Sequence, residues 1–264
     1  MVEPGWRARL PLPRIVAAVV LAPLALVCLY AGSAVFAAMV GLGAVILAFE
    51  WARLCVSDRP SVFALAIAAS VVVAVAAALV RQGGSAVAVI VVAAVSLFLA
   101  SARNAWVAAG VLYLGLPCVA LVWLHTTFAF GPSIILWLFI VVWTTDIGAY
   151  TVGRLAGGPN LAPRISPNKT WSGFFGGLGF ATACGSLLLV KLELMTGSSA
   201  ILASCGLSLA AQAGDLLESW IKRRFGVKDT GKLIPGHGGL LDRVDSLMTA
   251  SVVTAFCVVV GRGG

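Results

Sequence analysis

A stretch near the C-terminus places acids, a hydroxyl and bases at helical spacing. Residues 212–224 read Gln-Ala-Gly-Asp-Leu-Leu-Glu-Ser-Trp-Ile-Lys-Arg-Arg. If a helix continues past residue 217, then Asp215, Glu218, Ser219 and Lys222 share one face, because residues three and four apart are neighbours on a helix. A face with two carboxylates, a hydroxyl and an ammonium suits the binding of a metal ion and of phosphates.

The loop that follows is rich in glycine and leads into a second acidic helix end. Residues 225–239 contain five glycines, and Lys228 and Lys232 add positive charge. Glycines let backbone N–H groups approach an anion closely. Asp242 and Asp245 then lie three apart at the start of the last apolar block. Carboxylates from two helix ends suit Mg²⁺, which prefers one or two carboxylates together with phosphate oxygens and water.

A second polar segment lies earlier in the chain. Asp146 lies inside an apolar block, where a carboxylate is costly; it marks either a functional site or an ion pair between helices. Ser166, Lys169 and Thr170 precede a block that begins near Trp171. A helix N-terminus with a hydroxyl and an ammonium can bind an anion, but Ser166 or Thr170 can equally cap an ordinary helix. The spacing alone leaves both interpretations open.

The elements that position these residues are predicted to be transmembrane helices. Of the 264 residues, 61% are apolar and 11% are charged, against about 25% charged in soluble domains. Apolar blocks of about 20 residues match a helix that crosses the bilayer, where the backbone has no water to bond. We predict an all-α polytopic membrane protein with nine helices, at about 14–31, 33–50, 61–80, 85–101, 105–124, 133–152, 171–190, 199–217 and 240–260.

Basic residues predict the orientation of these helices. With the N-terminus in the cytoplasm, all of the 18 Lys and Arg residues except Arg81, Lys191 and Arg262 fall in cytoplasmic segments. We therefore expect a multi-pass protein of the cell (inner) membrane with its N-terminus and its site on the cytoplasmic side. The net charge of +8 is attributed to this topology and to anionic lipid, not to nucleic acid. The first block resembles a signal peptide, but its continuation into a second block favours an uncleaved helix.

The chain is predicted to divide into two regions. Residues 1–132 form a scaffold of about five helices, in which Glu50 and Trp51 are interpreted as an ordinary pair at the membrane–water boundary. Residues 133–264 form the catalytic region, with cytoplasmic loops at 153–170 and 218–241.

The second region resembles the phosphatidate cytidylyltransferases, also called CDP-diacylglycerol synthases. Each fixed position of the family signature is matched in Ser219-Trp-Ile-Lys222-Arg223, Lys228-Asp229, Gly231, Ile234-Pro235, His237-Gly238-Gly239-Leu240 and Asp242-Arg243-Val-Asp245. The segments 146–150 and 166–171 also look like parts of this family. Ser172 departs from it, because many members carry Glu or Gln there, and it is assigned no catalytic role.

The resemblance implies a reaction and roles for its residues. CTP and phosphatidate give CDP-diacylglycerol and diphosphate, in an Mg²⁺-dependent membrane protein that forms a homodimer. Asp215 and Asp242 are the implied metal ligands. The catalytic residues are then Asp215, Asp242, Asp245, Lys222 and Arg223, and the substrate-binding residues are Asp146, Ser166, Lys169, Thr170, Ser219, Lys228, His237, Gly238, Gly239 and Arg243. For His237 a structural or phosphate-binding role is preferred to proton transfer, because a phosphate monoester with a second pKa of about 6 is already anionic.

An ion-coupled transporter is the main alternative, because carboxylates in membrane helices also mark ion pathways. It predicts acids near the bilayer midplane and two related halves. Here the acids gather toward one face and the halves look unlike each other. The signature of CDP-alcohol phosphatidyltransferases is also absent, since two residues and not three separate Asp242 from Asp245.

Overall fold

Nine helices and one small hairpin are formed by the residues that the computed structural model describes, 12–231 and 238–263. The helices are α1 (Leu12–Tyr30), α2 (Ser33–Cys55), α3 (Pro60–Leu79), α4 (Gly83–Ala100), α5 (Ala105–Thr127), α6 (Gly131–Ala156), α7 (Trp171–Lys191), α8 (Gly197–Arg224) and α9 (Leu241–Gly263). Strands β1 (Asn160–Ala162) and β2 (Ser166–Thr170) pair antiparallel between α6 and α7.

The predicted class is confirmed: the protein is an all-α, multi-pass membrane protein. Within the described ranges, α2 to α9 are eight helices long and apolar enough to span a membrane, and α1 adds a shorter apolar stretch at Val20–Tyr30. The predicted loop limits were wrong at two places. α6 continues to Ala156 and α8 continues to Arg224, so that the connections begin at residues 157 and 225. The last turns of α8 are polar, but Glu, Lys and Arg are good helix formers. The β1–β2 hairpin was not predicted.

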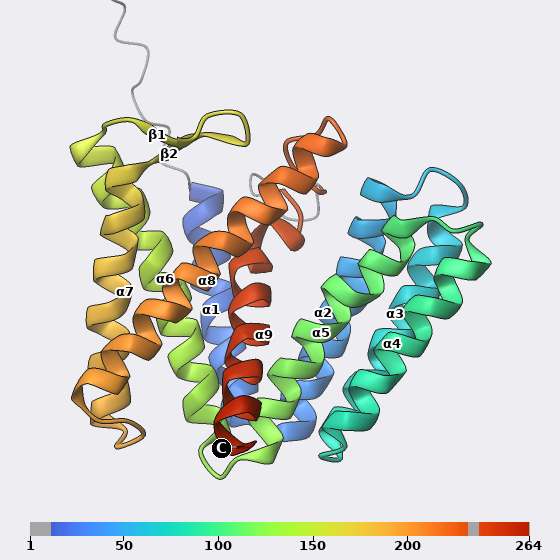
Figure 1. The fold of residues 1–264 in the computed structure, drawn as a ribbon, viewed down its shortest axis with the longest axis horizontal. Helices are drawn as coiled ribbons and strands as arrows, with labels where there is room; N and C mark the ends of the chain where they lie inside the picture. Colours follow the sequence, from blue (N-terminus) through green and yellow to red (C-terminus); the bar gives the residue numbers. More distant parts are fainter. Residues whose placement is uncertain (1–11, 232–237, 264) are drawn as a thin grey trace, which may run out of the picture.

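Successive helices run in alternating directions, as Figure 1 shows. The hairpin, the end of α8 and the start of α9 therefore lie at the same end of the molecule, and the C-terminus lies at the other. This brings the polar segments singled out in the sequence to one end of the helices. That this end faces the cytoplasm stays a prediction.

The second region packs in the order α6, α7, α8 and α9, with α8 crossing its neighbours obliquely (Figure 1). α6 and α7 approach closely because a glycine replaces a larger side chain between them. A Cβ atom on Gly177 would lie only 2.7 Å from the carbonyl oxygen of Thr145 in α6. Small residues are the usual means of close helix packing in membranes. α5 contacts both α2 and α9, and so joins the two regions.

Gly177→Ala is expected to lower the stability of the protein, because backbone in α6 must shift to admit the methyl group. Overpacking typically costs about 1–3 kcal/mol. The matched control is Gly179→Ala in the same helix, where an added Cβ meets nothing within 4 Å. Thermal unfolding in detergent micelles compares the two variants. Equal unfolding temperatures would show that the α6–α7 approach is not tight.

Candidate functional site

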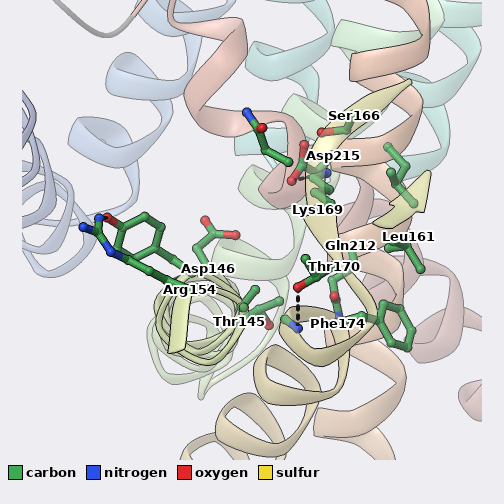
Figure 2. A pocket seen from close by; sticks show the side chains of 16 residues that line it. Thr145, Asp146, Arg154, Leu161, Ser166, Lys169, Thr170, Phe174, Gln212 and Asp215 are labelled. Carbon is green, nitrogen blue, oxygen red and sulfur yellow. Dashed lines mark hydrogen bonds and ion pairs between the residues drawn. The ribbon is translucent and has the colours of Figure 1, made fainter. Parts of the chain in front are cut away.

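A cavity of about 740 Å³ with several charged and polar residues in its lining lies between α6, the β1–β2 hairpin, α7 and α8. Five of the predicted site residues line it: Asp146, Ser166, Lys169, Thr170 and Asp215. They come from three elements that are distant in sequence, and Figure 2 shows the labelled side chains around the same space. The structure therefore brings the two polar segments of the sequence together.

An ion pair crosses this cavity. Lys169 on β2 places its Nζ 2.5 Å from Oδ2 of Asp215 on α8, and both side chains keep part of their surface exposed. Asp146 on α6 lies within the electrostatic reach of Asp215 and Lys169, and also of Arg243 on α9. The cavity thus holds two acids and a partly solvated ammonium, a combination that can bind a phosphate together with a cation.

The hairpin is held over this cavity by local hydrogen bonds. Thr170 caps α7, because its Oγ1 accepts from the backbone N–H of Gly173 at 3.1 Å. Ser172 donates its hydroxyl to the carbonyl oxygen of Gly157. The capping interpretation of Thr170 is thereby confirmed, and a role of Thr170 in anion binding stays a prediction.

Arg223 connects the two polar segments. Its Nε donates to the carbonyl oxygen of Ile165 in the hairpin turn, and its Nη1 donates to that of Val227, each at 3.2 Å. These bonds tether the hairpin to the end of α8. A guanidinium has five N–H donors, so Arg223 can keep both bonds and still offer donors to a phosphate.

A second cluster of charges lies between α8 and α9. The Nζ of Lys222 is 2.5 Å from Oε2 of Glu218 and 2.8 Å from Oδ1 of Asp242. The side chains of Lys222, Glu218 and Asp242 are 14%, 1% and 4% exposed. α8 does continue past residue 217, which is the condition under which Asp215, Glu218, Ser219 and Lys222 share one face. The residues on this face of α8 nevertheless have different neighbours. Asp215 lines the cavity, whereas Glu218 and Lys222 meet the start of α9.

Asp242 is also bonded to the glycine-rich loop. Its Oδ2 accepts from the backbone N–H of Thr230 at 3.0 Å, from the Thr230 hydroxyl at 3.1 Å and from the backbone N–H of Gly239 at 2.7 Å. Gly238 adopts φ +84°, and an added Cβ would lie 2.4 Å from Oδ2 of Asp242. The loop therefore needs glycine here to wrap around the carboxylate. Anion binding by Gly238 and Gly239 stays a prediction, but the N–H of Gly239 already has an acceptor within the protein.

Glu50 is a residue of this region that the sequence interpretation missed. It lies within α2 and is only 6% exposed, so its interpretation as an ordinary residue in contact with water was wrong. Its two carboxylate oxygens accept from the backbone N–H groups of Leu240 and Leu241, each at 2.8 Å. A carboxylate at the N-terminus of α9 satisfies helix N–H groups and is favoured by the helix dipole. The only signal in the sequence was an acid beside an apolar block, which does not reveal a backbone partner 190 residues away.

The remaining predicted residues take varied positions. Asp245 is 8% exposed, accepts from the backbone N–H of Ser246, and lies within the electrostatic reach of Asp215 and Glu218. Over the described ranges Ser219, Lys228 and Arg243 do not line the cavity. His237 lies outside the described residues.

The two predicted metal ligands, Asp215 and Asp242, differ in how well they suit a divalent cation. Residues 12–231 and 238–263 contain no group of three or more His, Cys, Asp or Glu side chains arranged to hold a metal ion. Asp215 fits, because its carboxylate faces the cavity, where phosphate oxygens and water can complete the coordination that Mg²⁺ prefers. Asp242 fits less well, since its oxygens are bonded to Lys222, Thr230 and Gly239. As a metal ligand it would have to leave some of these partners.

These features define a polytopic helical membrane protein with a charged cavity at one end of its helices. The sequence model of the cytidylyltransferase family matches residues 12–260, and the chain belongs to that family. A phosphatidate cytidylyltransferase of Brucella suis is 51% identical over 149 residues, 56% of this chain and 55% of that protein. One from Staphylococcus epidermidis is 44% identical over 135 residues, 49% of this chain and 50% of that protein. The chain thus spans about half the length of the curated relatives it matches.

Glu50→Ala is expected to destabilise the protein, because it leaves two backbone N–H groups at the start of α9 without their acceptor. An unsatisfied buried group costs about 1–3 kcal/mol. Glu193→Ala removes the same charge from an exposed turn and serves as the control. Thermal unfolding in micelles measures both, and the interpretation fails if the two variants unfold at the same temperature.

Lys222→Met is expected to lower the free energy of unfolding by about 3–5 kcal/mol, because Glu218 and Asp242 lose their shared cation. Adding Glu218→Gln to this variant should restore part of the stability, since one uncompensated carboxylate is then removed. Lys228→Met, at an exposed position, controls for the loss of a lysine. If the double variant is no more stable than Lys222→Met, the proposal that Glu218 and Asp242 share the Lys222 ammonium is contradicted.

Proposed function

We propose that this chain transfers a cytidylyl group from CTP to phosphatidate, forming CDP-diacylglycerol and diphosphate. The observation that carries the proposal is the cavity in which Lys169 and Asp215 meet at one end of membrane helices. Membership of the cytidylyltransferase family supports the reaction type. The name of the curated relatives, phosphatidate cytidylyltransferase, supports the lipid substrate.

The chemistry suits a site at a membrane boundary. An oxygen of the phosphatidate monoester attacks the α-phosphorus of CTP, a new P–O bond forms, and the bond to the bridging oxygen breaks so that diphosphate leaves with the electron pair. The attacking oxygen is already anionic, because the second pKa of a phosphate monoester is about 6. A strong general base is therefore unnecessary. The main task is to bring two polyanions together in line, which positioning and cations accomplish.

Lys169 is the side chain best placed for this task. Its ammonium lies in the cavity and keeps part of its surface exposed, so it can pair with a phosphate without first being brought out of a buried cluster. Lys222 is less accessible, because it holds Glu218 and Asp242 together. We propose that Lys169 neutralises substrate phosphate and that Lys222 mainly fixes the loop beside it.

We propose Mg²⁺ as the cofactor, with Asp215 as its first protein ligand and Asp242 as the second. When bound, Mg²⁺ would neutralise phosphate charge and stabilise the leaving diphosphate. A carboxylate on α8 that faces the cavity supports Asp215 in this role. A homodimer in the cell (inner) membrane, with the site and the N-terminus on the cytoplasmic side, completes the proposal.

Asp215→Asn is expected to abolish turnover, because it removes the carboxylate that faces the phosphates, while the membrane-inserted fold is retained. Asp242→Asn should also abolish turnover but should lower the unfolding temperature as well, since it disturbs the bonds to Lys222 and Gly239. The assay incubates purified protein with labelled CTP, Mg²⁺ and phosphatidate, and extracts lipid-soluble cytidine.

Asp58→Asn, at an exposed position between α2 and α3, is the matched control and should keep wild-type turnover. Near-normal activity of Asp215→Asn would refute its assignment. A wild-type protein that forms no cytidine-labelled lipid would refute the proposed function itself.

A further inference from the structure

The β1–β2 hairpin forms one wall of the cavity but contains no buried residue. Every residue from 157 to 170, the hairpin and its connection to α6, keeps part of its surface exposed. Gly157 and Gly158 join the hairpin to α6 with φ of +61° and +105°, and a Cβ atom added to either would meet nothing within 4 Å. A segment with few buried contacts opens at a low free-energy cost. Polar contacts therefore decide how firmly the hairpin is held in place.

The ion pair from the hairpin to α8 joins the two residues on which the proposed chemistry depends. The Nζ of Lys169 lies 2.5 Å from Oδ2 of Asp215, and Figure 2 shows both side chains at the cavity. In the proposed function Lys169 pairs with a substrate phosphate and Asp215 binds Mg²⁺. In this structure each of the two instead has the other as its partner.

An ammonium and a divalent cation compete for one carboxylate. If both were bound to Asp215 they would be close neighbours, and like charges repel strongly at such separations outside bulk water. Arg154 also lines the cavity, but its guanidinium donates to the hydroxyl of Tyr150 at 2.7 Å. Lys169 is therefore the cation whose position bears directly on Asp215.

We propose that the Lys169–Asp215 ion pair is a latch that holds the hairpin over the cavity, and that a divalent cation at Asp215 opens the latch by displacing the lysine. This inference rests on the metal role that the proposed function gives to Asp215. Binding and conformational equilibria are reciprocally linked, so a cation that loosens the hairpin binds more tightly once the lysine is removed. The latch also orders the steps, because Lys169 becomes available to a substrate phosphate only after the cation has reached Asp215.

Metal binding tests the latch, with Mn²⁺ as the probe and without either substrate. The purified chain in detergent micelles is titrated with Mn²⁺, and the free ion is followed by electron paramagnetic resonance. Lys169→Met should bind Mn²⁺ about two- to sixfold more tightly than the wild type, the range for a partly exposed ion pair. Lys169→Arg keeps the pair and should stay close to the wild type. Arg154→Met is the matched control, and Asp215→Asn gives the background.

Proteolysis reports whether the hairpin moves. Arg164, exposed in the turn between β1 and β2, offers trypsin a cleavage site that mass spectrometry identifies. In the wild type Mn²⁺ should speed this cleavage by about two- to sixfold, because proteolysis tracks the population of the open form. In Lys169→Met and in Asp215→Asn the cleavage should already be fast and should no longer respond to Mn²⁺.

The outcomes separate this inference from the proposed reaction. Equal Mn²⁺ affinity of the wild type and Lys169→Met, an equal gain in Arg154→Met, or wild-type binding no stronger than that of Asp215→Asn overturns the latch. Cleavage of the wild type that Mn²⁺ does not change overturns it too. A wild type that binds Mn²⁺ as expected but forms no cytidine-labelled lipid overturns the reaction and leaves the latch standing. If Lys169→Met does not fold, as judged by thermal unfolding, Lys169→Gln replaces it with the same expectations.

Discussion

The constraint on which the rest of this structure depends is the cost of placing carboxylates where helices meet the membrane boundary. Asp242 and Glu218 are almost fully buried, and each is compensated by Lys222 between them. Removing such charges from water costs several kcal/mol per ion unless partners and hydrogen bonds replace the lost hydration. This one ammonium therefore fixes the end of α8 against the start of α9, and with them the glycine-rich loop that connects the two helices.

The same constraint explains how the N-terminal region takes part in the site. Glu50 reaches from α2 to the first N–H groups of α9, while the indole N–H of Trp51 donates to the carbonyl oxygen of Trp106 on α5 at 2.8 Å. Trp106 in turn packs its ring edge to face with Phe225, directly after α8. The first region is thus more than a support for the second, because it satisfies and packs the two helix ends that carry the signature.

Whether a polar or charged group already has a partner within the protein also decides where substrates can bind. The N–H groups near the start of α9 already have carboxylate acceptors, whereas the cavity between α6, α7 and α8 holds an ion pair that remains partly exposed. Phosphates are therefore expected beside Lys169.

The sequence by itself determined the helices, the family and the segments that carry the charges. Lipid leaves a backbone no partner but itself, so each apolar block had to be a helix, and the spacing of Asp215, Glu218 and Lys222 set them on one face. Tertiary structure alone decided which neighbour each of them meets, because the same face of α8 contacts the hairpin through Asp215 and α9 through Lys222. It alone revealed Glu50 too, because its acceptor role depends on backbone N–H groups that every residue except proline carries and that no residue type marks.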